Sequence, residues 1–448
     1  MSPGRQQART VEEHAAAVLA RVAALPEDDV ALSTLAVAEP GRVLGGDVHA
    51  VAHVPPFDGA AMDGYAVRLA DLPADGATVT LPVVGDARPG SPARDRQEGE
   101  GAGGAVRIMT GAPVPAWADA VVPVERTSTE RFVAGAPTTE REVTLARQQR
   151  THVRHRGEDV RPGDLLARAG DAVTPALVAV AASAGLGSLP VRRRPRVAVL
   201  STGSELVPAG DEPGAGRIPD SNSLLLAALV RAAGADVERV GAVPDDADGL
   251  RRALDLAVGA PAGDVAGAAA GRADLVVTTG GVSAGASDVV RAVLAAPDAR
   301  LRDVELAAVA LRPGRPQALA RWQGVPWVAL PGSPVSAFVS FALFVRPALA
   351  VLGGRAPARP VRRRVASAWP SPPGRVHVVP VRTLPSGEVE RAVSPAGAGP
   401  RAAGPRPAVG GHATSALLGT DALALVPADA EKVEAGDEVD VLPLDGAT

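Results

Sequence analysis

The spacing of hydrophobic residues changes along the chain and divides it into segments. Residues 10–13, Thr-Val-Glu-Glu, form a capping box, and the helical spacing of apolar positions after it predicts a helix ending near residue 25. Later, short alternating runs broken by glycine and proline indicate strands, which we expect at residues 79–84, 105–109, 120–124 and 143–147. A further helix is expected at 175–184. We therefore predict a β-rich domain at 46–149, inserted in an elongated N-terminal domain formed by residues 1–45 and 150–190.

From residue 191 to 355, apolar strands alternate with helices. The strands are expected at 197–200, 236–243, 275–279 and 325–330, and the helices at 221–233, 246–258 and 287–295. Short apolar strands separated by helices are typical of a parallel sheet covered on both faces. The pattern predicts a doubly wound α/β domain, in which ligands bind beyond the carboxyl ends of the strands.

The last segment, 356–448, is rich in proline and has short alternating runs at 376–381, 389–394, 422–426 and 438–442. These runs predict a separate C-terminal β domain resembling a barrel. The fold class is thus multidomain α/β, with a doubly wound domain between β-rich N-terminal domains and a C-terminal β domain.

Composition excludes several kinds of protein. The 448 residues are 46% hydrophobic but only 2% aromatic, so the cores must consist of valine, leucine and alanine. A net charge of −4 gives no sign of a nucleic-acid partner. The absence of cysteine excludes disulfides, zinc–thiolate sites and thiol nucleophiles. The single lysine, Lys432, is not part of a P-loop.

One apolar run, residues 335–352, is long enough to be considered as a membrane span. Arg346 and Pro347 interrupt it and a Pro-Gly-Ser-Pro turn precedes it, which favours a buried helix. The first 25 residues are polar and have no apolar signal-peptide core. We therefore expect a cytoplasmic protein without a membrane partner.

Three loops of small residues follow predicted strands of the α/β domain. They are LSTGSE at 200–205, TTGGVSAGASD at 278–288 and LPGSPVS at 330–336. Backbone N–H groups in such loops approach anions closely, and the helices that follow add positive potential. Any one of them alone is better explained as a tight turn, but three at one sheet edge favour an anionic ligand.

Charged residues add to this picture. The carboxylates of Asp63, Asp159, Glu205, Asp220 and Asp288 suit Mg²⁺ bound beside phosphate, although Asp220 and Asp288 are equally suited to cap helices. Arg312 and Arg315, on one short turn, match oxyanions bidentately, unless that turn is merely solvated surface.

A serine hydrolase is a competing hypothesis. The sequence GVSAG at 281–285 matches a nucleophile elbow, and Ser283, Asp303 and His377 would complete a triad. Two residues separate the predicted strand from this motif, and His377 lies in the predicted C-terminal domain, so we do not favour it.

Several motifs together resemble the molybdopterin molybdotransferases, the family shared with the E domain of gephyrin. They are PPFDGAAMDGYAV at 55–67, IMTGAPVP at 108–115, RGEDV at 156–160, STGSEL at 201–206, PDSN at 219–222, TGGVS at 279–283 and LPGSPVS at 330–336. Each is short, but their order spans nearly the whole chain.

The resemblance implies a four-domain, L-shaped subunit in an elongated homodimer. Its active site would lie between the α/β domain of one chain and the β-rich domain of the other. The implied reaction takes adenylated molybdopterin and molybdate, releases AMP and leaves molybdenum on the dithiolene, with Mg²⁺ assisting. Contact with the molybdopterin adenylyltransferase is also implied.

The resemblance also assigns site residues. The catalytic residues would be Asp63, Thr110, Glu205 and Asp288, with Asp63, Glu205 and Asp288 also at the metal and with Asp63 and Thr110 contributed by the partner subunit. The substrate-binding residues would be Asp159, Thr202, Asp220, Ser221, Asn222, Gly280, Gly281, Ser283, Arg312, Arg315, Pro331, Gly332, Ser333 and Ser336.

The chain departs from the family at positions 308, 312 and 315 and at the pair 286-287. Where the family usually reads KVAxKPGKP, this chain has Ala308, Arg312 and Arg315, so one cation is lost and two are retained as arginine. The pair Ala286-Ser287 replaces an acidic or aromatic residue frequent in relatives. These changes leave open a catalytically degenerate member that acts as a gephyrin-like scaffold.

Overall fold

The computed structural model describes residues 8–37, 41–92, 103–132, 140–259, 272–283, 288–392 and 414–444. It divides into two compact units. Unit 1 comprises Met1–Asp28, Glu39–Gly45 and Val191–Thr448, and unit 2 comprises Asp29–Ala38 and Gly46–Pro190. Each unit is described by itself.

Unit 2 contains a five-stranded sheet in the order β7-β4-β6-β5-β8. Its strands are β4 (Gly64–Val67), β5 (Thr78–Ala87), β6 (Ala105–Ile108), β7 (Ala120–Pro123) and β8 (Glu142–Ala146). Alternate residues of β4 enter two cores, Tyr65 and Val67 on one face and Ala66 on the other. A Cβ on Gly64 would lie 2.0 Å from the Val122 carbonyl oxygen, so only glycine permits this pairing with β7.

Shorter elements complete unit 2 and its connections. Two pairs of short strands lie within it: β2 (Val48–His49) with β10 (Leu165–Ala167), and β3 (Gly59–Ala60) with β9 (Val153–Arg154). The helices are α2 (Leu32–Val37), α3 (Pro175–Ser183) and the short η1 (Leu69–Asp71) and η2 (Val124–Arg126). At the boundary of the units, β1 (Glu27–Ala31) pairs with β11 (Ser188–Arg192).

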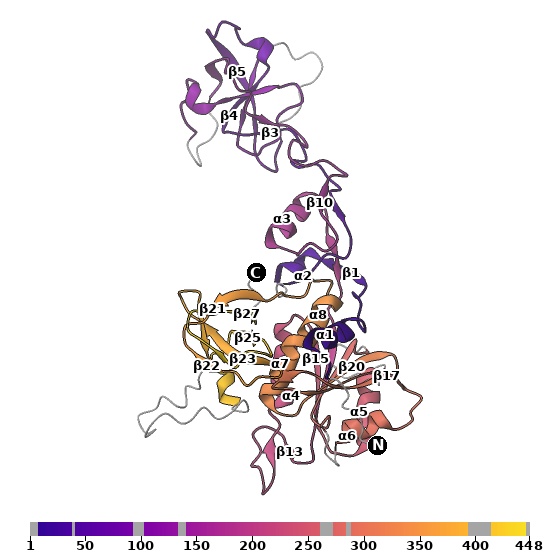
Figure 1. Ribbon diagram of the computed structural model, residues 1–448. Coiled ribbons are helices and arrows are strands. Elements are labelled where there is room, and N and C mark those ends of the chain that lie inside the picture. Colours follow the sequence, from indigo (N-terminus) through magenta and orange to yellow (C-terminus); the bar gives the residue numbers. More distant parts are fainter. Residues whose placement is uncertain are drawn as a thin grey trace. The chain divides into compact units, whose positions relative to one another are not determined.

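The α/β part of unit 1 is built on a six-stranded sheet in the order β15-β12-β16-β20-β19-β17 (Figure 1). The first four strands are parallel: β15 (Asp236–Val243), β12 (Arg196–Thr202), β16 (Leu275–Thr279) and β20 (Val325–Leu330). The last two, β19 (Pro316–Trp322) and β17 (Leu301–Ala308), form an antiparallel hairpin that the apolar pattern does not predict.

Helices cover both faces of this sheet, which confirms the predicted doubly wound arrangement. In β12, Val197 and Val199 pack into the core that contains α4 (Asn222–Ala232), whereas Ala198 and Leu200 pack into the core that contains α5 (Ala247–Val258) and α6 (Val289–Ala295). The alternation follows from the period of two in a strand.

The apolar run forms a continuous helix, Pro334–Leu352, and 78% of its most hydrophobic window is buried inside the protein. It consists of α7 (Pro334–Ser340), a π-helical segment η3 (Phe341–Val345) and α8 (Arg346–Leu352). Phe338, Phe341 and Phe344 all belong to the same core as α4. The described helix is long and apolar enough to cross a membrane, but its side chains pack against protein.

The N-terminal helix α1 (Val11–Leu19) also packs into this core, through Val11 and Val18. The predicted capping box is present: Glu13 N–H donates to Thr10 Oγ1 at 3.1 Å, and Thr10 N–H donates to Glu13 Oε2 at 2.8 Å. The helix ends at Leu19 rather than near residue 25. Its packing places it with the α/β part of unit 1.

The C-terminal part of unit 1 is a sheet in the order β18-β23-β25-β27-β21, with β24 paired to β23. Its strands are β18 (Leu311–Arg312), β21 (Val361–Arg364), β23 (Val376–Thr383), β24 (Val389–Arg391), β25 (Ala422–Val426) and β27 (Glu438–Pro443). A short pair, β22 (Trp369–Pro370) with β26 (Lys432–Val433), and the turn η5 (Thr414–Leu417) accompany it.

This sheet is continuous with the α/β part in two respects. Its edge strand β18 comes from the loop of the β17–β19 hairpin and pairs in parallel with β23, so the sheet crosses the expected boundary at residue 355. Val378, Leu423 and Leu442 also share a core with Phe338 of α7. The two parts therefore share a core, and a site can form between them.

Candidate active site

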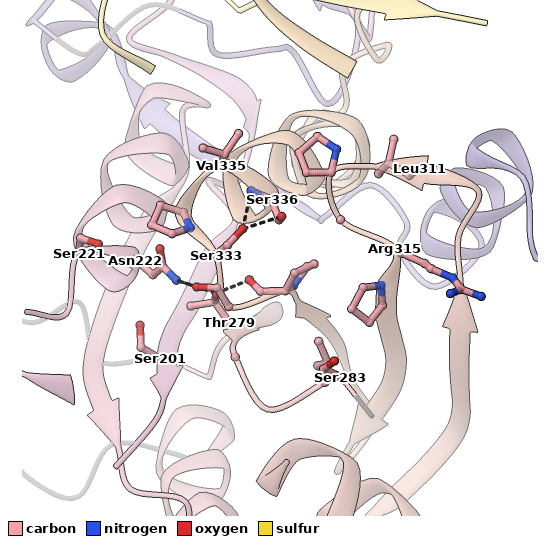
Figure 2. A pocket seen from close by; sticks show the side chains of 18 of the residues that line it. Ser201, Ser221, Asn222, Thr279, Ser283, Leu311, Arg315, Ser333, Val335 and Ser336 are labelled. Atoms are coloured by element: carbon pink, nitrogen blue, oxygen red, sulfur yellow. Dashed lines mark hydrogen bonds between the residues drawn. The ribbon is translucent and has the colours of Figure 1, made fainter. Parts of the chain in front are cut away.

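A cavity of about 1060 Å³ lies at the carboxyl ends of β12, β16 and β20, between the α/β part and the C-terminal sheet of unit 1. All three small-residue loops contribute to its wall (Figure 2). The lining includes these residues predicted from the sequence: Thr202, Glu205, Asp220, Ser221, Asn222, Gly280, Gly281, Ser283, Asp288, Arg312, Arg315, Pro331, Gly332, Ser333 and Ser336.

Glycines allow the strand ends to pack backbone against backbone. Gly280 has φ +95°, and a Cβ there would lie 2.5 Å from the Thr202 carbonyl oxygen. Gly281 has φ +63°, and its Cβ would lie 3.0 Å from Thr202 Oγ1. A Cβ on Gly332 would approach Gly280 Cα to 3.3 Å. The three loops thus meet at glycines, which leaves main-chain groups at the cavity wall.

Asn222 connects helix α4 to two of these loops. Its Nδ2 donates to the Gly332 carbonyl oxygen at 2.7 Å and to Thr279 Oγ1 at 3.2 Å, and Thr279 Oγ1 donates to the Pro331 carbonyl oxygen at 2.8 Å (Figure 2). Asn222 and Thr279 therefore orient the loop after β20. Asn222 acts here as a donor to protein atoms, and its Oδ1 is buried without a partner in the described structure.

The turn at Ser333 opens the long helix Pro334–Leu352. Ser333 is its N-cap: the Ser333 hydroxyl accepts from Ser336 N–H at 3.4 Å and donates to Ser336 Oγ at 2.7 Å. The first turn of a helix has free N–H groups and positive potential, which suits a phosphate.

Asp220 is buried, and its carboxylate accepts hydrogen bonds from the start of α4. Ser223 donates to it from the backbone N–H at 3.1 Å and from Oγ at 2.5 Å, and Arg239 Nη1 donates to Ser223 Oγ at 3.0 Å. Ser221 is the N-cap residue but makes no side-chain cap bond. Asp220 thus orders the start of α4 at the cavity.

Four arginines line the side of the cavity near the C-terminal sheet. Arg312 and Arg315 come from the β17–β19 loop, and Arg375 and Arg391 come from the C-terminal part. Among the described residues, none of the four side chains forms an ion pair. Arg312 pairs in register with His377, which brings segments 65 positions apart to one wall. Sequence reasoning missed Arg375 and Arg391 because no local pattern shows that β23, which follows Arg375, pairs with β18, or that β24, which ends at Arg391, pairs with β23.

His377 also lines the cavity and is neutral near pH 7. Burial, followed by the charges of Arg312 and Arg391, lowers its pKa to about 4. Its Nδ1 is 3.2 Å from Ser371 Oγ.

These contacts contradict the serine-hydrolase hypothesis. Asp303 Oδ2 accepts from Arg321 Nε at 3.1 Å and does not line the cavity, and the hydrogen-bonding partner of His377 is Ser371. Ser283 and His377 both line the cavity but Asp303 does not, so these three residues form no triad.

Four carboxylates line the cavity: the predicted Glu205, Asp220 and Asp288, and Asp245, which sequence reasoning missed. Asp245 Oδ2 accepts from Ser204 N–H at 3.0 Å, and its own N–H donates to Ser204 Oγ at 3.0 Å. Over the described ranges no group of three acidic or histidine side chains is arranged to hold a metal by itself. Mg²⁺ usually needs only one or two carboxylates when phosphate supplies further oxygens, so this donor set fits the ion with a phosphate ligand.

The remaining predicted residues lie in unit 2. Asp63 Oδ1 accepts from Thr110 N–H at 2.7 Å and from Thr110 Oγ1 at 2.8 Å, so these two side chains form one contact. Asp159 N–H donates to the Val54 carbonyl oxygen at 3.1 Å. None of the three is among the residues that line the cavity of unit 1.

Of the departures from the family pattern, Ala308 ends β17 and accepts a backbone bond from Arg9 N–H at 2.9 Å. The pair Ala286-Ser287 lies outside the described residues.

Comparisons with known proteins agree with this geometry. The model of the MoeA N-terminal region (domain I and II) matches residues 9–185, that of a probable molybdopterin binding domain matches 198–351, and that of the MoeA C-terminal region (domain IV) matches 362–444. The chain belongs to the MoeA family. The predicted family resemblance and fold class are thereby confirmed.

Relatives and solved structures support the same membership. Molybdopterin molybdenumtransferase 2 of Mycobacterium tuberculosis is 42% identical over 370 residues, which cover 80% of this chain and 84% of that protein. Molybdopterin molybdenumtransferase 1 of the same organism is 34% identical, with 97% and 98% covered. A crystal structure of the molybdopterin biosynthesis MoeA protein from Pyrococcus horikoshii has a TM-score of 0.74 at 27% identity and covers 98% of this chain and 100% of that one.

Proposed function

We propose that this protein is a molybdopterin molybdenumtransferase, which inserts molybdate into adenylated molybdopterin and releases AMP during molybdenum cofactor biosynthesis. The observation that carries the proposal is one cavity with two kinds of anion-binding wall. Glycine loops and a helix N-terminus suit the phosphates of a pterin nucleotide, and four arginines suit a tetrahedral oxyanion. Its family membership agrees with this activity.

In this proposal the main chain at Gly280 and Gly281, and the helix turn at Ser333 and Ser336, hold the phosphate part of the substrate. The arginine wall holds molybdate near the dithiolene. Because both substrates are anionic, fixed donors that need no reorganisation lower the energetic cost of bringing them together.

We also propose that one or two of the cavity carboxylates Glu205, Asp245 and Asp288 hold Mg²⁺ together with substrate phosphate oxygens. Bound there, the ion would neutralise charge that forms when the phosphoanhydride is cleaved. Treatment with a chelator should abolish AMP release and added Mg²⁺ should restore it; full activity in the chelated enzyme would contradict this part of the proposal.

A homodimer is the assembly we propose, with Asp63, Thr110 and Asp159 completing the partner's site. Helix α3 supports it: the sequence PALVAVAAS is apolar all round, yet only Ala181 is buried, and Val180 is 41% exposed. Val180→Asp should shift the sedimentation coefficient to that of a monomer. Leu256→Asp, at a 74% exposed position on α5, should leave it unchanged.

Two further parts of the proposal concern the cell. The protein would act in the cytoplasm and would receive its substrate from the molybdopterin adenylyltransferase. Fractionation of the native host, and co-sedimentation of the two purified proteins, test these points separately.

The decisive experiment is turnover with purified protein, adenylated molybdopterin, molybdate and Mg²⁺, with AMP release as the readout. AMP that appears only when molybdate is present supports the transferase. A folded protein that releases no AMP and does not rescue a strain lacking the native transferase would instead support the scaffold alternative.

A further inference from the structure

A buried glutamine connects two walls of the cavity. Gln317 is the second residue of β19 and is 1% exposed, and its Nε2 donates to the Gly314 carbonyl oxygen at 2.8 Å and to Ser340 Oγ at 2.7 Å. Ser340 is fully buried and is the last residue of α7, the helix that begins with the turn at Ser333. The link therefore runs from the loop that carries the arginines to the helix that carries the serine turn.

The arginine turn, residues 312–315, is attached at its two ends to different parts of unit 1. Arg312 pairs with β23 of the C-terminal sheet, where Val376 N–H also donates to the Ala310 carbonyl oxygen at 3.0 Å. At the other end, the Arg315 carbonyl oxygen accepts from Val309 N–H at 2.8 Å. Gln317 adds the bond from this end to α7.

The backbone of Gly314 packs closely against the side chain of Ser340. Its φ is +105°, and a Cβ there would lie 3.1 Å from Ser340 Oγ. Both Nε2 hydrogens of Gln317 are used in the link, whereas its Oε1 is buried without a partner in the described structure. Since unpaired buried polar groups are costly, this amide is held by the two bonds it donates.

We infer that Gln317 and Ser340 are positioning residues for the oxyanion. They hold the Arg315 end of the turn in register with helix α7, and so fix how the guanidinium of Arg315 and the helix N-terminus at Ser333 are arranged around one ligand. The inference rests on the proposed function, because it assigns molybdate to the arginine turn. Neither residue lines the cavity, and both act through Arg315.

The test uses the full-length variants Gln317→Leu and Ser340→Ala. Affinity for the molybdate ion alone is measured by calorimetry, and both KM values and kcat are measured by AMP release. The dissociation constant and KM for molybdate should each rise roughly five- to ten-fold, the loss expected for one buried hydrogen bond. The value of kcat and the KM for adenylated molybdopterin should stay within about two-fold.

Double variants separate positioning from general destabilisation. Gln317→Leu should add little to the loss of molybdate affinity caused by Arg315→Ala, because both changes act through the same guanidinium. In a double variant with Arg375→Ala, the two fold-losses of molybdate affinity should multiply, because the changes act independently. Thr278→Val is the matched control, since it removes a comparably buried bond from Trp327 Nε1 at 2.9 Å between β16 and β20, and neither residue lines the cavity. It should lower Tm and leave molybdate affinity unchanged.

Three results would overturn the inference. Molybdate affinity could be unchanged in Gln317→Leu, or it could fall equally in the control Thr278→Val. The fold-losses of molybdate affinity caused by Gln317→Leu and Arg315→Ala could also multiply in the double variant. Absence of molybdate binding by the wild type would also overturn it. A wild type that binds molybdate but releases no AMP would refute the proposed function, and the binding measurements would still decide the inference.

Discussion

Gly280 and Thr202 lie so close together that no side chain fits between them. A Cβ on Gly280 would stand 2.5 Å from the Thr202 carbonyl oxygen and 2.8 Å from Thr202 Oγ1. This contact joins the ends of β12 and β16 and sets the shape of the loop at 280–283. The same residue has φ +95°, where a side chain is strained even in open space.

The variant Gly280→Ala should therefore lose activity by about 100-fold or more, because the loop must move to admit a methyl group. Gly436→Ala is the matched control: its φ is +92°, but nothing lies within 4 Å of its Cβ. AMP release and Tm measured on both variants separate the clash from the backbone strain. Equal losses in the two variants would contradict the role assigned to the contact.

The two substitutions Asn222→Ala and Asn222→Asp should differ in severity. Alanine removes the bonds from Nδ2 to Gly332 and Thr279, whereas aspartate places a charged acceptor against the Gly332 carbonyl oxygen, 2.7 Å from the present Nδ2. We expect kcat/KM to fall about ten-fold further in the aspartate variant than in the alanine variant. The opposite order would mean that Asn222 contacts substrate rather than orienting the loop.

Removal of an arginine from the cavity should weaken molybdate binding through charge. Arg375→Ala should raise the KM for molybdate by about ten-fold at low salt and by less at 0.5 M salt, because screening reduces the contribution of exposed charges. Arg364→Ala, on the exposed strand β21, removes the same charge away from the cavity and should change neither value. Equal KM shifts in the two variants would show a general electrostatic effect.

Acid should destabilise unit 1 through His14. This residue of α1 is fully buried against Phe344, with ring centroids 4.6 Å apart, and neither ring nitrogen has a hydrogen-bonding partner in the described structure. Burial, then the charge of Arg9, lowers its pKa from 6.5 to about 4. Since the unfolded chain takes up the proton first, stability should fall as the pH decreases from about 6.5 to about 4, by roughly 1 kcal/mol per pH unit.

The variant His14→Leu should lose this part of the pH dependence. Denaturant unfolding at pH 7.5 and pH 5.0 measures the change in the free energy of unfolding for wild type and variant, so any constant difference from repacking cancels. His377 titrates in the same range and remains in both proteins. An identical pH dependence in the two proteins would contradict the prediction.

Most local structure follows from sequence alone. The strands at Asp236–Val243, Leu275–Thr279 and Val325–Leu330 have the predicted bounds, because an apolar run of that length between turn residues has few alternatives. The capping box at Thr10 and the three small-residue loops likewise depend only on residues that are adjacent in the sequence. The expectation of an anionic ligand rests on these loops and needed no knowledge of the packing.

Other features depend on residues that meet only in the folded chain. The β17–β19 hairpin, the pairing of Arg312 with His377 and the presence of Arg375 and Arg391 at the cavity all result from strand registers between distant segments. The placement of α1 in unit 1, by burial of Val11 and Val18, is of the same kind. Sequence determined the elements and the chemistry of each loop, since these depend on adjacent residues. Tertiary structure decided which loops share a cavity, because hydrophobic burial and strand pairing act across hundreds of residues that no local pattern records.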